Sequence, residues 1–151
     1  MNRLKLILVG LIPLVVGTVF SQAVVKLDGL APRAWLVALF FLTGWIVLGY
    51  ISGTWGGGAL YSTLWAHLPA ALLLIAVAYQ QVRGGWFDGV IGSISQTFFL
   101  PLISLANFLP VAWLRRTFLF GAGVSFVIMV LAFLWGARSR QNFEATRGDT
   151  R

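Results

Sequence analysis

Cysteine is absent from the 151-residue chain, which excludes disulfide bonds, iron–sulfur clusters, thiolate zinc sites and cysteine nucleophiles. Charge is also scarce. Only 10% of the residues are charged, against about 25% in ordinary soluble domains. Four residues are acidic and one is a histidine, so the chain has few of the side chains from which acid–base pairs and metal sites are built.

Long apolar runs take the place of charge, and 59% of the residues are hydrophobic. No acid, lysine or arginine occurs from Ala34 to Val82, and a chain of this size cannot bury that much apolar surface in one core. The runs predict an all-α, polytopic transmembrane bundle: one membrane domain over residues 1–140 and a polar, mobile tail over 141–151. The expected spans are 6–25, 34–52, 59–82, 90–114 and 117–137.

The net charge of +7 comes from basic residues at the edges of these runs. A nucleic-acid-binding protein gathers such residues on one folded face, whereas flanking positions are typical of anchors at anionic headgroups. The pattern therefore predicts the lipid bilayer as a partner, excludes nucleic acid, and indicates a multi-pass protein of the plasma membrane. The flanking residues are Arg3, Lys5, Lys26, Arg33, Arg83, Arg115, Arg116, Arg138 and Arg140.

The amino-terminal run also resembles a secretory signal, because Arg3 and Lys5 precede an apolar stretch that ends in Ser21-Gln22-Ala23. Cleavage there would leave a chain beginning near Val24. The run is longer than a typical signal core and further spans follow, so an uncleaved first helix is favoured.

The segment from Val90 to Leu114 is long enough to span a bilayer, yet it carries a polar stripe. On a helix the stripe covers a face about 100° wide, and Ser95 lies on the opposite side. Three structures could carry it. The favoured one is a fifth span with the stripe turned into the bundle. The others are a re-entrant element broken at Pro101 and Pro110 and a helix lying in the interface. The stripe consists of Ser93, Gln96, Thr97, Ser104 and Asn107.

Basic residues give a partial test of topology. Five spans with the amino terminus outside place seven Lys and Arg residues in the cytoplasm and four outside. Four spans with both termini inside give six against five. The rule favours five spans with a cytoplasmic carboxyl-terminal tail, although this topology places the basic residues Arg3 and Lys5 outside.

His67 is the single histidine and lies within the third predicted span, one turn after Thr63 and two residues before Pro69. An ionisable group in a membrane is a candidate for a proton relay or a metal or haem ligand. Without a second ligand nearby, we expect instead a neutral imidazole hydrogen-bonded to Thr63, a carbonyl or a neighbouring helix. No cofactor is predicted, but a haem shared between two subunits and a quinone stay open.

Two acids, Asp28 and Asp88, lie in the first and third predicted loops. In any topology that begins with three spans, these two loops lie on the same side of the membrane. Paired carboxylates could perform acid–base chemistry. Lys26, Arg33 and Arg83 lie on that side too, so surface ion pairing is the favoured interpretation.

Small residues mark two helix faces on which backbones could approach closely. Gly49 and Gly53 form one face, before the glycine-rich break at 53–58. The other consists of Gly121, Ser125, Ala132 and Gly136. The partner could be an internal helix, another membrane subunit or a second copy of the chain.

The predicted function is a non-enzymatic subunit or accessory component of a membrane complex, which packs through these faces. One alternative is a small transporter or channel component for a neutral or amphipathic solute, with the stripe and His67 lining the path. A second is a membrane enzyme acting on a lipid or quinone, which rests on His67, Asp28 and Asp88 alone.

Overall fold

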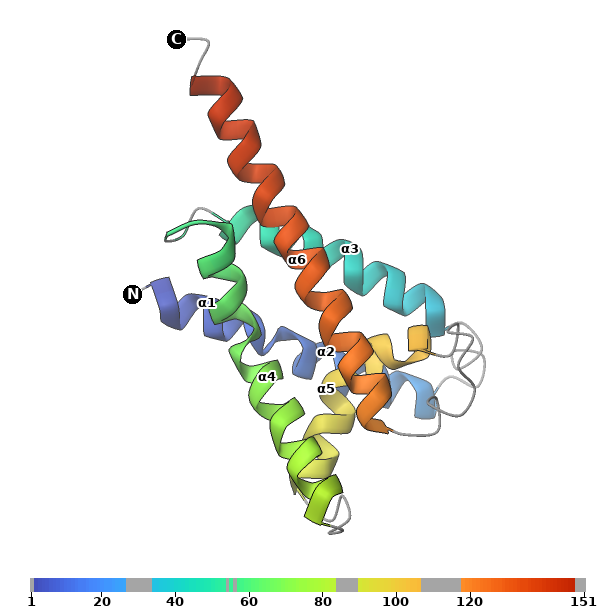
Figure 1. Cartoon of the computed structure of the whole chain (residues 1–151). Helices are drawn as coiled ribbons and strands as arrows, with labels where there is room; N and C mark the ends of the chain where they lie inside the picture. The colour runs from blue at the N-terminus through green and yellow to red at the C-terminus, as the bar shows by residue number, and fades with distance from the viewer. Residues whose placement is uncertain are drawn as a thin grey trace.

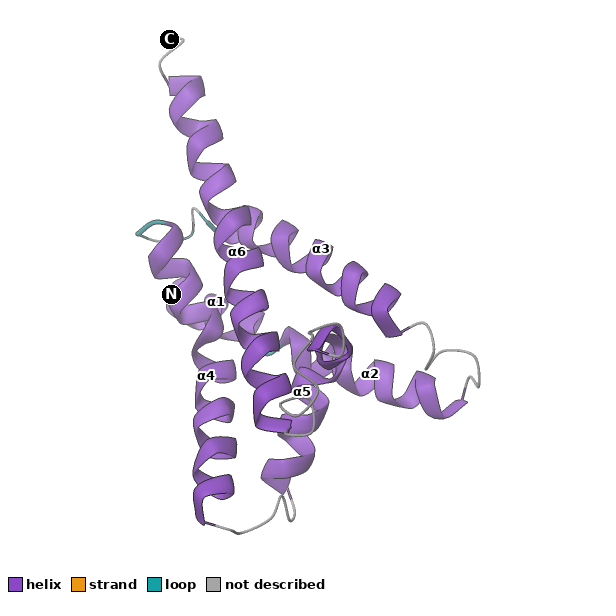
Figure 2. Ribbon diagram, turned by 45° about the vertical axis from the view of Figure 1, so that its right-hand side comes forward, coloured by secondary structure: helices purple, strands orange, loops and turns teal. Residues whose placement is uncertain are grey.

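The computed structural model describes residues 2–26, 34–53, 55, 57–83, 90–106 and 118–148. All the regular structure in these ranges is helical (Figures 1 and 2). Four stretches are long and apolar enough to cross a membrane: 3–24, 35–52, 59–82 and 118–147. The expected all-α class is therefore confirmed. The helices are α1 (Asn2–Gly10), α2 (Ile12–Lys26), α3 (Ala34–Ser52), α4 (Ala59–Arg83), α5 (Val90–Ala106) and α6 (Phe118–Gly148).

The first candidate span is interrupted at Leu11, between α1 and α2. Pro13 has no N–H to donate to the Val9 carbonyl, so the regular ladder cannot pass through this point. Tighter three-residue bonds bridge it, from the Leu11 N–H to the Leu8 carbonyl (3.1 Å) and from the Leu14 N–H to the Leu11 carbonyl (3.0 Å). The predicted run 6–25 is thus two helices that follow one another, and the first already begins at Asn2.

The glycine-rich break lies where the sequence predicts it. α3 ends at Ser52 and α4 begins at Ala59. Gly57 and Gly58 have φ angles of 83° and 105°, which residues with a Cβ rarely adopt. These glycines let the chain reverse within a few residues, so α3 and α4 run in opposite directions.

α3 and α6 run parallel and in close contact. Gly49 lies against Phe133, and Gly53, four residues later, lies against Ala137. A Cβ on Gly136 would overlap the Ile46 carbonyl, so the two backbones can approach this closely only because glycine occupies the contact.

α1 and α4 form a second parallel pair. Arg3 reaches Tyr61 near the start of α4, and Gly10 contacts Ala66 further along it. The start of α1, the start of α4 and the end of α3 therefore lie at one end of the bundle, the upper left of Figure 1. Because α6 runs parallel to α3, its carboxyl-terminal part leaves the bundle at the same end. We call this the termini end.

α5 differs from the other helices in length and course. It has 17 residues and is not among the candidate spans. It begins beside the end of α4 and finishes near the start of α3 (Figure 1). α6 then starts at the end of the bundle opposite the termini end, the end at which α4 also finishes. Five spans are not confirmed: α5 is not among the four stretches that are long and apolar enough to cross a membrane.

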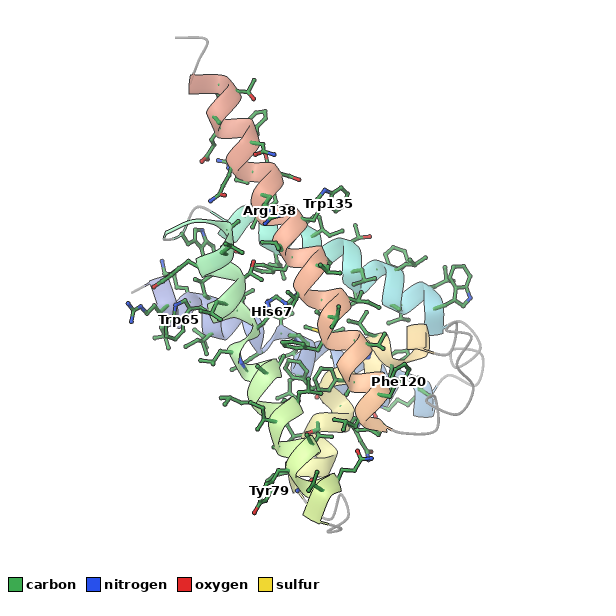
Figure 3. The ribbon with its side chains drawn as sticks, in the orientation of Figure 1. Trp65, His67, Tyr79, Phe120, Trp135 and Arg138 are labelled. Atoms are coloured by element: carbon green, nitrogen blue, oxygen red, sulfur yellow. The ribbon has the colours of Figure 1, made fainter. Side chains whose placement is uncertain are left out.

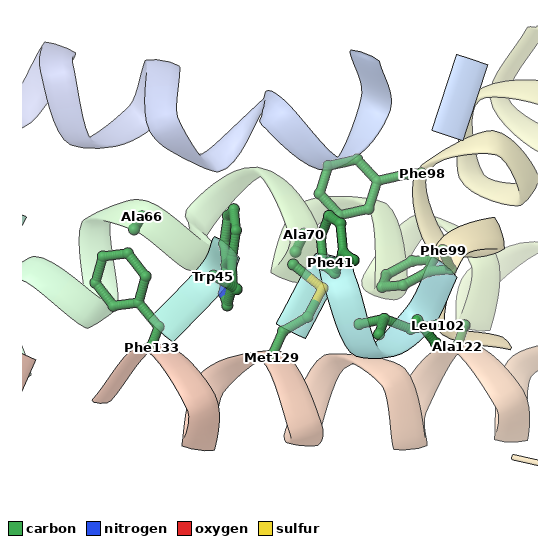
Figure 4. Close-up of a cluster of buried hydrophobic side chains, with 11 residues drawn as sticks. Phe41, Trp45, Ala66, Ala70, Phe98, Phe99, Leu102, Ala122, Met129 and Phe133 are labelled. Atoms are coloured by element: carbon green, nitrogen blue, oxygen red, sulfur yellow. The ribbon is translucent and has the colours of Figure 1, made fainter. Parts of the chain in front are cut away.

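The core lies where α3, α4, α5 and α6 meet (Figure 4). Trp45 of α3 is almost fully buried among Phe133 of α6 and neighbouring rings. α5 inserts Phe98, Phe99 and Leu102, each no more than 1% exposed. Although α5 is short, it therefore fills the bundle with large side chains and is not a peripheral attachment.

The sequence predicts a polar, mobile tail from residue 141. In the structure α6 continues through this segment to Gly148. Ordinary helix contacts explain the extension: Arg140 pairs with Glu144 at 2.8 Å, and the Thr146 hydroxyl donates to the Asn142 carbonyl. No proline or glycine interrupts the helix between Gly136 and Gly148.

Candidate functional site: the buried His67 cluster

His67 lies on α4 and points into the bundle toward α3 and α6, as Figure 3 shows for the labelled side chain. Its side chain is buried, at 4% exposure. Nδ1 lies 2.8 Å from the Thr63 carbonyl oxygen, and the Trp45 indole N–H of α3 donates to Nε2 at 3.2 Å. Nε2 must then be the acceptor, so the hydrogen-bond pattern assigns the proton to Nδ1, which donates to Thr63.

This arrangement uses both ring nitrogens of a neutral imidazole. Neither is left for a metal or a haem iron while the Trp45 bond is in place. The sequence predicts a neutral imidazole hydrogen-bonded to Thr63, a carbonyl or a neighbouring helix. The structure has bonds of this type, and the contact to Thr63 is with its main-chain carbonyl. The Thr63 hydroxyl instead donates to the Ala59 carbonyl at 2.7 Å.

Aromatic rings enclose the imidazole on several sides. Trp45, Phe126 and Phe133 each meet it edge-on, with ring centroids 5.6, 6.1 and 5.3 Å away. Such edge-to-face contacts add to the stability of a buried cluster. His67 thus ties α4 to both α3 and α6.

One side of the imidazole faces a groove between α4 and α6. The groove has a volume of about 330 Å³. Apart from Thr63 and His67, its lining is apolar and includes Leu64 of α4 and Phe126 and Leu134 of α6. A second groove of about 300 Å³ lies between α2 and α3, around Gly44 and Phe40, and Trp45 lines its floor.

Two of the three described residues of the polar stripe do not face the bundle. Ser93 and Gln96 are exposed and Thr97 is half-buried, with its carbonyl against Gly17 of α2. The side chain of Ser104 and the whole of Asn107 lie outside the described residues. The expectation that the stripe turns inward is therefore wrong for Ser93 and Gln96.

The volume of the side chains explains which face of α5 is buried. Ser95, Phe98, Phe99 and Leu102 recur at intervals of three and four residues, and they form the buried face. Burying two phenylalanines gains far more than burying two neutral polar groups. Ser95 is carried inside with them, and its hydroxyl has no hydrogen-bond partner within the described part of the chain.

The small-residue faces lie largely at internal contacts. Gly49, Gly53 and Gly136 lie between α3 and α6. Gly121 and Ser125 are buried and Ala132 is partly buried against the core. For the glycines of this contact, the neighbouring helix belongs to the same chain.

Two arginine–aromatic contacts mark the termini end. The Arg3 Nε–H donates to the Tyr61 hydroxyl at 2.7 Å, and its guanidinium lies 5.1 Å from the Trp65 ring centre. Arg140 lies 5.3 Å from the ring centre of Tyr50 while pairing with Glu144. Cation–π contacts of this kind hold a guanidinium in place at a surface.

The acidic pair considered above, Asp28 and Asp88, lies outside the described residues. No group of three or more metal-ligating side chains occurs among the residues that the structure describes.

Compared with models of protein families, with curated proteins and with solved structures, the chain gives no match.

Trp45 is the site residue that sequence reasoning missed. It is 22 positions from His67 and on another helix, so no local spacing connects the two. The only available signal was a tryptophan in the middle of an apolar run. Buried indole N–H groups usually find an acceptor, and His67 was a candidate for that acceptor within the predicted spans.

Proposed function

We propose that the chain is a non-catalytic integral membrane protein that acts as a subunit or accessory component of a membrane complex. The observation that carries the proposal is the end of α6. This helix has 31 residues and is about 46 Å long, well beyond the hydrocarbon core of about 30 Å. Its last turns project from the bundle (Figures 1 and 2).

The projecting segment has the chemistry of a docking element. Residues 142–147 are all exposed, and Phe143 is 54% exposed among charged and polar neighbours. A short helix without tertiary contacts is marginal in water. A large apolar side chain on such a helix supports contact with another protein, because aromatic side chains dominate the energetics of protein interfaces.

We place the protein in the plasma membrane with the termini end, and hence the carboxyl-terminal segment, in the cytoplasm. Arg3, Lys5, Arg138 and Arg140 gather at this end, and short cytoplasmic segments are enriched in Lys and Arg. The tryptophans Trp65 and Trp135 lie near the same end (Figure 3), as expected of a membrane–water interface.

Native mass measurement after purification in mild detergent tests the proposal. The wild-type chain is expected to carry a stoichiometric second protein. Phe143→Asp should release that protein, whereas Asn142→Asp, which adds the same charge at the neighbouring exposed position, should retain it. A mass equal to this chain alone, or to a multiple of it, would contradict the subunit assignment.

A further inference from the structure

The groove between α4 and α6 has the dimensions of a single hydrocarbon chain. It extends along α4 from Leu60 to Ala71, a rise of about 17 Å. Its volume of about 330 Å³ leaves room for one hydrocarbon chain along that length.

The walls of the groove are suited to lipid. Leu60 and Leu64 are 69% and 67% exposed, and they stand on the outer edge of α4. Phe126, Val130 and Leu134 recur every four residues on α6 and form the opposite wall. Apolar walls at the outside of candidate spans match the hydrocarbon of a bilayer.

A basic residue continues the α6 wall at the termini end. Arg138 follows Leu134 by one helical turn, so it lies on nearly the same side of α6, and it is exposed. Figure 3 shows it above His67 along α6. The groove therefore runs from an apolar interior to a cation at the level where lipid headgroups lie.

Arg138 also differs from the two arginines near it. Arg3 is held by Tyr61 and Arg140 by Glu144. No hydrogen bond or ion pair joins Arg138 to any residue that the structure describes. Its guanidinium is free to bind a phosphate in the bidentate manner typical of arginine.

The second groove lies between α2 and α3, where Val37 and Phe40 form part of its wall. The lining of neither groove includes a charged residue. Among the residues that the structure describes, only the α4–α6 groove has a cation one helical turn beyond its wall.

We propose that the α4–α6 groove binds one anionic phospholipid of the surrounding bilayer, with an acyl chain along Leu64 and Leu134 and the phosphate on Arg138. The inference rests on the membrane embedding contained in the proposed function. It does not depend on a protein partner. A lipid in this position would cover the open side of the His67 cluster.

Lipid selectivity in nanodiscs tests the site. The protein is reconstituted into equal amounts of phosphatidylglycerol and phosphatidylcholine, and the bound lipids are counted by native mass spectrometry. The wild-type chain should retain phosphatidylglycerol roughly fivefold over phosphatidylcholine, the preference that one arginine gives at an anionic surface. Arg138→Gln should bring the ratio close to one.

Matched variants separate the site from general charge and surface effects. Lys5→Gln removes the same charge from an exposed position at the termini end and should keep the preference. Leu64→Trp, which fills the groove, should reduce the number of bound lipids. Leu72→Trp, at an exposed α4 position outside the groove, should not.

Three results would overturn the lipid site: no preference in the wild-type chain, an unchanged preference in Arg138→Gln, or an equal loss in Lys5→Gln. A chain that does not enter nanodiscs would overturn the membrane assignment together with the site. A chain that shows the preference but no protein partner would leave the lipid site standing and contradict only the subunit proposal.

Discussion

At the scale of single residues, most of the buried polar side chains that the structure describes hydrogen-bond to a carbonyl of their own helix. Ser52, Thr63 and Ser125 each donate to the carbonyl four residues earlier. Such bonds hold a hydroxyl without attaching it to a neighbouring helix. The Trp45–His67 bond is different, because it joins α3 to α4 inside the core.

Replacing Trp45 by Phe tests the energetic value of that bond. The phenyl ring keeps most of the aromatic packing but leaves His67 Nε2 without a donor. We expect the free energy of unfolding to fall by about 1–3 kcal/mol, the cost of an unsatisfied buried polar group. Trp35→Phe, at an exposed position of α3, should change it little. Equal effects of the two variants in thermal unfolding would show that the bond contributes nothing.

Ser95 allows the opposite experiment. Its buried hydroxyl has no partner within the described part of the chain, so Ser95→Ala loses no hydrogen bond and removes a desolvated polar group. We expect the free energy of unfolding to be unchanged or up to about 1 kcal/mol higher. Ser125→Ala, which removes the bond to the Gly121 carbonyl, should lower it by about 0.5–1 kcal/mol. A loss above about 1 kcal/mol for Ser95→Ala would mean that the hydroxyl has a partner, such as a water.

At the scale of elements, α3 and α6 are in close backbone contact, the kind of packing that would hold two helices together inside a bilayer, where the hydrophobic drive is missing. Gly49 and Gly136 allow the contact, and dispersion between the approaching backbones then stabilises the pair. Both faces were visible in the sequence. Their pairing was not, because a small-residue face is equally compatible with an internal helix, another subunit or a second copy.

Two glycines of α6 form a matched pair for testing this contact. Gly136→Ala places a methyl group against the Ile46 carbonyl and must separate α3 from α6, so we expect a loss of about 1–3 kcal/mol in unfolding free energy. An added Cβ on Gly123 meets nothing within 4 Å. Gly123→Ala should therefore gain about 0.5–1 kcal/mol from helix propensity. Unfolding in detergent, followed by circular dichroism, measures both, and the same sign for the two variants would refute the close-contact account.

α5 shows where helix periodicity stops being informative. Ser93 and Gln96 do lie on one face of α5, but periodicity alone does not say which face is buried. The face carrying Phe98 and Phe99 is buried instead, because large rings fill the space between α3 and α6. The polar face of a membrane helix is usually expected to turn toward the other helices. In α5, Phe98 and Phe99 are buried, whereas Ser93 and Gln96 are exposed.

At the scale of the whole molecule, α3 and α4 were predictable because their apolar runs specify their lengths. Their directions depend on pairings between distant segments, such as Arg3 with Tyr61 and Arg140 with Tyr50. These pairings place the beginning of α1 and the end of α6 together. If the apolar helices cross a membrane, as proposed, this placement requires an even number of crossings, which the count of basic residues alone did not favour.

Cysteine labelling decides this topology, and the chain contains no cysteine of its own. Lys5→Cys and Asn142→Cys are exposed at the termini end, and Gln81→Cys is exposed near the end of α4. In sealed vesicles of one orientation, an impermeant maleimide should label the first two positions together and leave Gln81→Cys unlabelled; inverted vesicles should give the reverse. Detergent should make all three reactive, which controls for local accessibility. Labelling of Lys5→Cys and Asn142→Cys from opposite faces would require an odd number of crossings, and α5 would then have to span the membrane.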